Sequence, residues 1–113
     1  MSLIYILCAP AVYEAAGSAG EYAPDSLALE GFIHASPANR LTRVANKYYQ
    51  ANECLCILTI DEDKVSVPIQ WEAISNGDLY PHLYGPLNMD AVVRVQEVQR
   101  AVNGTYTIHV DEP

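Results

Sequence analysis

Residues 31–37 have the sequence Gly-Phe-Ile-His-Ala-Ser-Pro, and this stretch constrains the fold more than any other. Its Phe-Ile pair predicts a short buried strand, which the preceding glycine lets the chain enter through a sharp turn. Ser36 followed by Pro37 predicts a helix start, because a serine oxygen can cap free amides and proline suits the first helical position. His34 is therefore expected between a strand end and a helix N-terminus, where polar chemistry and anions commonly collect.

Three further segments of the first half have clear patterns. Residues 3–8 and 54–60 are continuous apolar runs, which are typical of fully buried strands. A short helix is expected from Pro10, and the glycines at positions 17 and 20 weaken and end it. Residues 21–30 contain the turn signal Pro-Asp-Ser and are predicted to form a loop.

A helix from residue 37 to about residue 50 is the clearest prediction in the chain. Its apolar side chains recur at helical spacing and form one stripe, made of Leu41, Val44, Ala45 and Tyr48. A row of basic side chains lies beside the stripe, made of Arg40, Arg43 and Lys47. The row either faces a phosphate group or forms an ordinary solvated surface. The second interpretation is favoured, since only the first helical turn could approach His34.

The second half of the chain predicts strands without crossover helices. Its expected elements are strands at 65–67 and 69–74, a turn at 75–78, a shaped loop with a short extended centre at 80–88, a strand at 91–98, and a hairpin turn at 103–104 followed by a closing strand at 105–110. Together with the early helices, this pattern predicts one α+β domain over residues 1–113 with a mixed or antiparallel sheet system.

The composition indicates a globular protein of acidic character. Half of the 113 residues are apolar, and fourteen acidic against six basic residues give a net charge of −8. This charge argues against non-specific DNA or RNA binding and against an anionic membrane surface, and it leaves a small molecule or a basic protein as the easier partner. No apolar run approaches the roughly 20 residues that span a bilayer, and no secretory signal is recognisable. The three cysteines are expected to be reduced thiols of a cytoplasmic protein.

Seven residues are candidates for a functional site: His34, Ser36, Trp71, Glu72, His82, Tyr84 and Asn88. A histidine titrates near neutral pH and can act as an acid, a base or a hydrogen-bond donor. Glu72 ends an apolar segment, so we expect a partly buried carboxylate that could orient a ribose hydroxyl or stabilise positive charge. His82 and Tyr84 are two residues apart, so they project to the same side of an extended piece.

Each candidate also has a purely structural interpretation. The histidines and aromatic residues can be satisfied members of a core, and Glu72 can pair with Arg94 or Arg100. Ser36 is more readily a helix cap than a nucleophile, since no Gly-x-Ser-x-Gly elbow surrounds it. No recognised ligand spacing joins the two histidines and Glu72, so no metal site is predicted.

Seven motifs spread over nearly the whole chain carry a family resemblance: Leu3-Ile4-Tyr5, Ser26-Leu27, residues 30–36, Val44-Ala45-Asn46, Ile60-Asp61, Trp71-Glu72 and residues 81–87. The last motif, Pro-His-Leu-Tyr-Gly-Pro-Leu, is the most specific. Together they resemble a bacterial family known as domain of unknown function 952. That family is similar in fold to the ADP-ribosyltransferase group, in which NAD lies in a cleft between two small sheets.

The resemblance implies a split, strand-rich ADP-ribosyltransferase-like α+β fold with two or three short helices in the N-terminal half. It implies a cytoplasmic protein that binds NAD or a related nucleotide and, if catalytic, acts at the ribose C1′ carbon. Glu72 and His34 would then be catalytic, and the ligand-binding residues would be Ser36, His82, Tyr84, Trp71 and Asn88. Many relatives carry a basic residue where this chain has Ile6, which favours an alternative: a non-enzymatic small-ligand or protein-binding module that keeps the cleft without the reaction.

Overall fold

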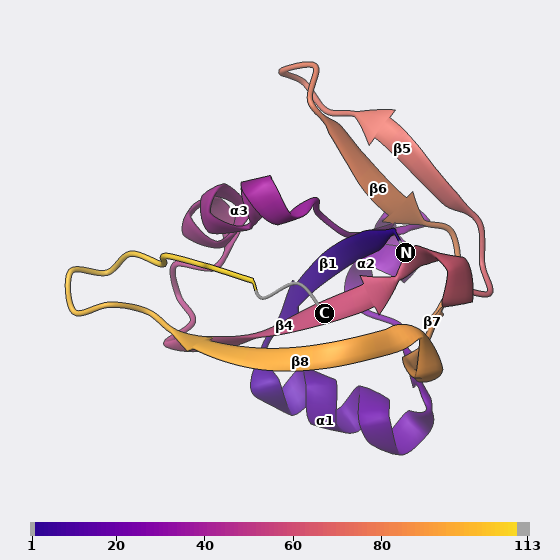
Figure 1. Cartoon of the computed structure of the whole chain (residues 1–113), viewed down its shortest axis with the longest axis horizontal. Coiled ribbons are helices and arrows are strands. Elements are labelled where there is room, and N and C mark those ends of the chain that lie inside the picture. Colours follow the sequence, from indigo (N-terminus) through magenta and orange to yellow (C-terminus); the bar gives the residue numbers. More distant parts are fainter. Residues whose placement is uncertain (1, 111–113) are drawn as a thin grey trace.

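The computed structural model describes residues 2–110, which form an α+β structure with three antiparallel sheets (Figure 1). The helices are α1 (Pro10–Ala19), α2 (Asp25–Glu30) and α3 (Leu41–Tyr48). The strands are β1 (Leu3–Cys8), β2 (Glu21–Tyr22), β3 (Ile33–His34), β4 (Cys54–Asp61), β5 (Ile69–Ala73), β6 (Leu79–Leu83), β7 (Leu87–Asn88) and β8 (Val92–Gln99). The sheet orders are β1-β4-β8, β2-β7 and β3-β6-β5. The predicted α+β class is confirmed.

Strands β1 and β4 of the β1-β4-β8 sheet are buried on both faces. The cluster on the α1 side includes Ile4, Ile6, Cys8, Cys56, Leu58, Ile60 and Ala16 of α1. The cluster on the α3 side includes Tyr5, Leu7, Leu55, Ile57, and Leu41 and Ala45 of α3. Each fully buried leucine or isoleucine contributes roughly 1.5–3 kcal/mol to stability. Burial on both faces explains why β1 and β4 have apolar side chains at consecutive positions, and both strand predictions are confirmed.

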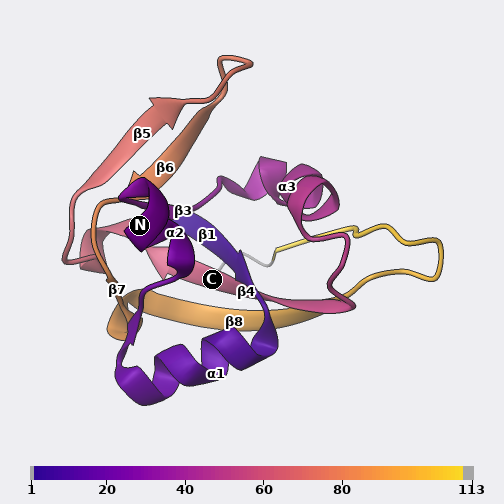
Figure 2. The same cartoon turned by 180° about the vertical axis from the view of Figure 1, so that it is seen from behind.

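A backbone bridge connects this sheet with the β3-β6-β5 sheet. The Tyr5 N–H donates to the Ser36 carbonyl over 2.9 Å, and the Ser36 N–H donates to the Tyr5 carbonyl over 2.8 Å. One residue earlier, the Ala35 N–H donates to the Pro81 carbonyl over 3.1 Å. Adjacent residues thus pair with strands of two different sheets. From both sides of the molecule, the β5–β6 hairpin extends away from the β1-β4-β8 sheet (Figures 1 and 2).

The helix predicted from residue 37 begins later, and Ser36 does not cap it. A 3-10 turn at Ala38–Arg40 precedes α3, whose last residue is Tyr48. The Ser36 hydroxyl donates to the carbonyl of Pro37 over 2.9 Å instead of accepting from a helical amide. The Ser36 backbone is committed to the bridge with Tyr5, so the chain is still extended where the cap was expected.

Two segments predicted as loops are regular elements. Residues 25–30 form α2, which begins directly after Pro24 and ends at Gly31, whose φ of 90° is left-handed. The Pro-Asp-Ser signal fits a helix start as well as a turn, since both place the proline φ near −65°. Residues 79–83 form β6 although Pro81 lies within it. The backbone N and C=O of one strand residue point to the same side. The Pro81 carbonyl accepts from Ala35, so the missing N–H of Pro81 also faces the β3 side. Strand β3 ends at His34, so Pro81 interrupts no strand pairing there.

Two predicted strands are absent from the described residues. Residues 65–67 form no strand, and the Ser66 N–H donates to the Asn88 Oδ1 over 2.9 Å. Residues 105–110 lie against α3 instead of pairing with β8. Tyr106 and Ile108 are buried there, and their backbone groups bond to Asn46 and Thr42 side chains. The alternating pattern therefore reflects an extended segment packed on a helix.

The structure also bears on the predictions for the three cysteines and for a membrane-spanning segment. Within residues 2–110, no helix combines the length and apolarity needed to cross a bilayer. The three cysteines are free thiols, as expected. Burial, with a smaller contribution from the neighbouring Cys56, raises the pKa of Cys8 to about 12.

We predict that Asn46→Ala destabilises the protein by about 1–3 kcal/mol. The Asn46 amide donates to the Tyr106 carbonyl over 2.9 Å and accepts from the Tyr106 N–H over 2.7 Å, so the substitution leaves backbone groups of a buried residue unpaired. Urea unfolding measures the loss. Asn39→Ala, at an exposed position, is the matched control and is expected to change stability by less than about 0.5 kcal/mol. Equal effects of the two substitutions would contradict the assignment.

Candidate functional site

One face of the β3-β6-β5 sheet gathers most of the candidate residues. His34 on β3 is directly opposite His82 on β6, and Gln70 on β5 is opposite His82 on the other side. Side chains two residues apart along a strand share a face. Glu72 and Tyr84 therefore lie on the same face as the two histidines. We call Glu30, Phe32, His34, Glu72, His82 and Tyr84 the Glu72 cluster.

Glu72 accepts two hydrogen bonds on one carboxylate oxygen. The Nδ1 of His82 lies 2.9 Å from Glu72 Oε1, and the Tyr84 hydroxyl donates a short hydrogen bond to the same oxygen. An ionised carboxylate can only accept, so His82 must carry a proton on Nδ1. Among residues 2–110, His82 makes its hydrogen bonds through Nδ1 alone. In the neutral imidazole, Nε2 is then an acceptor or base that is oriented by Glu72.

Phe32 packs among the three other rings of the cluster. Its ring stacks on His82 with centroids 4.1 Å apart, meets His34 edge-on at 4.9 Å, and lies 5.5 Å from Tyr84. The two histidine rings are 5.4 Å apart. Phe32 was not among the predicted site residues, although its position two residues before His34 places it on the same face. Glu30, whose Oε2 lies 2.9 Å from His34 Nε2, was not among them either, because α2 was not predicted.

The cluster is partly open to solvent and acidic. The His82 side chain is only 8% exposed, whereas those of Glu72 and His34 are 42% and 56% exposed. Hydrogen bonds from Tyr84 and then from His82 hold the pKa of Glu72 below its usual range. The bond to Glu72 in turn raises the pKa of Tyr84. At neutral pH the site therefore presents an ionised carboxylate suited to accept a hydroxyl proton or to stabilise nearby positive charge.

Three predicted site residues lie outside the cluster. Trp71 points to the opposite face of β5 and donates through Nε1 to Glu62 over 3.3 Å. The Ser36 side chain is buried against Pro37. Asn88 donates to the Lys64 carbonyl over 2.8 Å and accepts from Ser66, so it links two segments of the chain. Each of these three side chains therefore makes a contact that connects parts of the fold.

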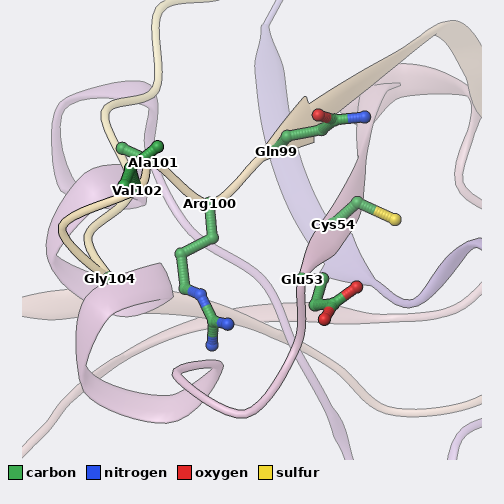
Figure 3. A pocket seen from close by; sticks show the side chains of 7 residues that line it. All are labelled: Glu53, Cys54, Gln99, Arg100, Ala101, Val102 and Gly104. Carbon is green, nitrogen blue, oxygen red and sulfur yellow. The ribbon is translucent and has the colours of Figure 1, made fainter.

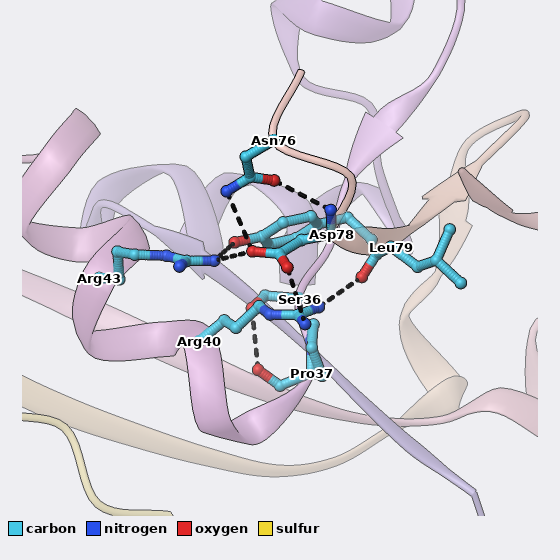
Figure 4. A network of polar contacts seen from close by, with 8 residues as sticks. Ser36, Pro37, Arg40, Arg43, Asn76, Asp78 and Leu79 are labelled. Atoms are coloured by element: carbon cyan, nitrogen blue, oxygen red, sulfur yellow. Dashed lines mark hydrogen bonds and ion pairs between the residues drawn. The ribbon is translucent and has the colours of Figure 1, made fainter. Parts of the chain in front are cut away.

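Two of the three side chains in the basic row, Arg40 just before α3 and Arg43 on α3, hold the β5–β6 hairpin (Figure 4). Arg43 donates to Asp78 over 2.6 Å and to the Tyr80 hydroxyl over 2.9 Å. Arg40 donates to the Leu79 carbonyl over 2.8 Å and lies 3.3 Å from the Asp78 carboxylate. These ion pairs, chiefly the bond from Arg43, keep the pKa of Asp78 below its usual range. Neither interpretation offered for the row anticipated this hairpin attachment.

One surface pocket lies away from the Glu72 cluster. It has a volume of about 410 Å³ and is lined by Glu53, Cys54, Gln99, Arg100, Ala101, Val102 and Gly104 (Figure 3). A second pocket, of about 300 Å³, lies between α1 and the segment around Tyr22. Neither contains a residue predicted for the site. We favour the cluster, because it concentrates polar and aromatic side chains and contains two groups, Glu72 and Tyr84, whose pKa values are shifted.

Among residues 2–110, no three His, Cys, Asp or Glu side chains are arranged to hold a metal ion. Ile6 is buried in the core cluster on the α1 side.

A family model described as Protein of unknown function (DUF952) matches residues 7–95. The chain is also similar to solved structures of protein CC0527 from Caulobacter crescentus. A crystal structure of that protein and one of a double mutant each have a TM-score of 0.84 and 29% sequence identity, over 94% of both chains. Its solution NMR structure has a TM-score of 0.79 at 29% identity, over 93% of this chain and 91% of that one. No curated protein matches the chain.

We predict that Glu72→Gln lowers stability at neutral pH but not in acid. The pKa of Glu72 is lower in the folded protein than its ordinary value of 4.5. Its ionised form therefore stabilises the fold fully above that ordinary value, and the contribution is lost as the pH falls through the folded-state pKa. Urea unfolding of wild type and Glu72→Gln between about pH 7 and pH 3 tests this. The exposed carboxylate of Glu97 provides the control Glu97→Gln. If the wild type remains more stable than Glu72→Gln by the same amount in acid, the prediction is contradicted.

Proposed function

The chain belongs to the DUF952 family of proteins of unknown function, and we propose that it binds NAD or a related nucleotide through the Glu72 cluster. The observation that carries this proposal is the Glu72 carboxylate, which is fixed by His82 and Tyr84 beside Phe32 and an exposed His34. A proposed ADP-ribosyltransferase-like fold agrees with two small antiparallel sheets that meet at Ser36. The buried free thiols support a proposed cytoplasmic location.

The residues of the cluster suit chemistry at a ribose. Bound NAD would supply a C1′ carbon whose bond to nicotinamide breaks with the electron pair leaving on the nicotinamide. Glu72 would accept a hydrogen bond from a ribose hydroxyl and stabilise the positive charge that develops at C1′. His34 is exposed and adjacent, so it would contact the nicotinamide amide or a phosphate. Phe32 and Tyr84 offer aromatic surface beside these polar groups.

Two side chains of the basic row are not available to the same ligand. Arg40 and Arg43 are both committed to Asp78 at the tip of the β5–β6 hairpin. In this proposal, the histidines contact the phosphates of the nucleotide. The protein recognises the nucleotide mainly through contacts with its ribose and its base.

A non-enzymatic binding module is the second candidate, and Ile6 favours it. This side chain is buried in the core where many relatives carry a basic residue, so the first strand offers no charged contact to a nucleotide. Binding without turnover is the distinguishing property. Labelled NAD that binds but transfers nothing to protein, RNA or small acceptors would select this candidate.

We predict that NAD shifts the backbone amide NMR signals of residues 31–36, 72 and 82–85. Glu72→Gln should weaken binding roughly tenfold to a hundredfold, because a hydrogen bond to a charged group is worth about 1.5–3 kcal/mol. His34→Ala should also weaken it. Glu97→Gln removes the same charge from a distant strand and should leave the affinity unchanged. Nicotinamide mononucleotide and ADP-ribose, titrated separately, identify the half of NAD that is recognised.

The titration also has a clear negative outcome. An absence of shifts at about millimolar NAD would overturn nucleotide binding, since such an affinity corresponds to only about 4 kcal/mol. Shifts confined to the residues of the 410 Å³ pocket would move the site to that pocket.

A further inference from the structure

The Glu72–His82 pair has the geometry of a general base. The imidazole donates through Nδ1 to Glu72 Oε1 over 2.9 Å, and its ring stacks on Phe32 with centroids 4.1 Å apart. The carboxylate thus fixes the tautomer of the imidazole, and the stacked phenyl ring fixes its orientation. A carboxylate that holds Nδ1–H in this way leaves Nε2 as the basic atom of the ring.

Nε2 of His82 is open to solvent, although most of the side chain is buried. In the described part of the chain, His82 makes its hydrogen bonds through Nδ1 and none through Nε2. Across residues 2–110, the buried side-chain nitrogen and oxygen atoms that lack a partner belong to Thr59 and Gln96. Nε2 lacks a partner and is not among these buried atoms, so a water molecule can reach it and donate to it.

The second carboxylate oxygen of Glu72 is also available. His82 and Tyr84 both bond to Oε1, and no donor from residues 2–110 bonds to Oε2. A ribose hydroxyl can therefore donate to Oε2 while a water molecule donates to Nε2 of His82. One imidazole ring and one hydrogen bond connect the two sites, so a single ribose can lie beside both.

His34, the second histidine of the cluster, is less suited to act as this base. Its Nε2 lies 2.9 Å from Glu30 Oε2, and its side chain is far more exposed than that of His82. A ring packed within a sheet is held in a more defined orientation than an exposed one. We therefore assign the phosphate contact of the proposed function to His34 and the base to His82.

We propose that the Glu72 cluster hydrolyses the bond between C1′ and nicotinamide in NAD, with His82 as the general base for water. This inference rests on the proposed binding of NAD. The C1′–N bond breaks, and its electron pair stays on the nicotinamide nitrogen. The water oxygen forms a bond to C1′, and a water proton moves to Nε2 of His82, which then releases it to solvent. The products are nicotinamide, ADP-ribose and one proton.

The openness of the cluster favours water as the acceptor. Glu72, His34 and Tyr84 are all partly exposed, so solvent has access to the groups that would surround C1′. Transfer to another acceptor requires that water is kept away from the reacting carbon. Hydrolysis would leave no label on protein or RNA, because the labelled product is free ADP-ribose.

The tautomer of His82 can be measured in the protein without a ligand. We predict a protonated Nδ1 and a bare Nε2 at neutral pH, which long-range proton–nitrogen NMR spectra of the ring distinguish. Glu72→Gln should shift the ring toward the Nε2–H tautomer, because a neutral amide holds Nδ1–H less firmly than a carboxylate does. The exposed ring of His109 is the internal reference and should not respond. A wild-type His82 that is protonated on Nε2 overturns its role as a base, even if NAD binds.

His82→Asn is expected to slow nicotinamide release about a hundredfold or more, because a positioned general base contributes at least that factor. The affinity for NAD should remain nearly unchanged, since the asparagine amide can still donate to Glu72. Chromatography at saturating NAD follows the release, NMR titration measures the affinity, and circular dichroism verifies folding. His109→Asn makes the same change at an exposed histidine outside the cluster and should alter neither quantity.

The outcomes separate this inference from the proposed function. A wild-type protein that binds NAD without releasing nicotinamide overturns the hydrolysis and leaves nucleotide binding intact. Release that His82→Asn leaves unchanged overturns the role of His82. If NAD does not bind, the proposed function fails and the hydrolysis fails with it.

Discussion

The paired backbone hydrogen bonds between Tyr5 and Ser36 hold the two larger sheets of this protein together. Ala35 bonds to β6 and Ser36 bonds to β1, so the chain changes from one sheet to the other within two residues. Because strand side chains alternate with a period of two, this junction also fixes which side chains face the core. Ile33 is buried in the core cluster on the α1 side, and His34 is directed to the open face. A shift by one residue would exchange them.

The β5–β6 hairpin is attached along β6 and at its tip, and the Glu72 cluster lies beside the attachment along β6. Near the core, Pro81 accepts from Ala35 beside the bridge. At the tip, Asp78 is held by Arg40, just before α3, and by Arg43 of α3. A site on strands that are fixed in this way keeps its geometry without the ordering cost that a loop would have. The arginines thus serve the site by positioning it.

Within the cluster, one carboxylate oxygen organises the other groups. Glu72 orients His82 and Tyr84, and the ring of Phe32 packs on His82 from the neighbouring strand. This arrangement gives an ionised acid, a histidine of defined tautomer and aromatic surface on one face. It contains no lysine or arginine, so it suits a ligand that presents hydroxyl groups and an electron-poor centre better than one recognised mainly through phosphate.

The α+β class, β1, α1, β4 and β8 were predictable from the amino-acid sequence, because a strand buried on both faces leaves a continuous apolar run and the other elements leave local patterns of their own. The shared side of His82 and Tyr84 was predictable too, since it follows from a spacing of two residues. Long-range contacts, in contrast, set the bonds of Glu72 to both of them, the place of Pro81 inside β6, and the packing of residues 105–110 on α3. Each of these depends on residues that are distant in sequence: the partner of Glu72 across a hairpin, the early end of β3, and the side chains of Thr42 and Asn46. Local sequence cannot encode which distant donor meets which acceptor, and that pairing separates Ser36, Trp71 and Asn88 from the cluster.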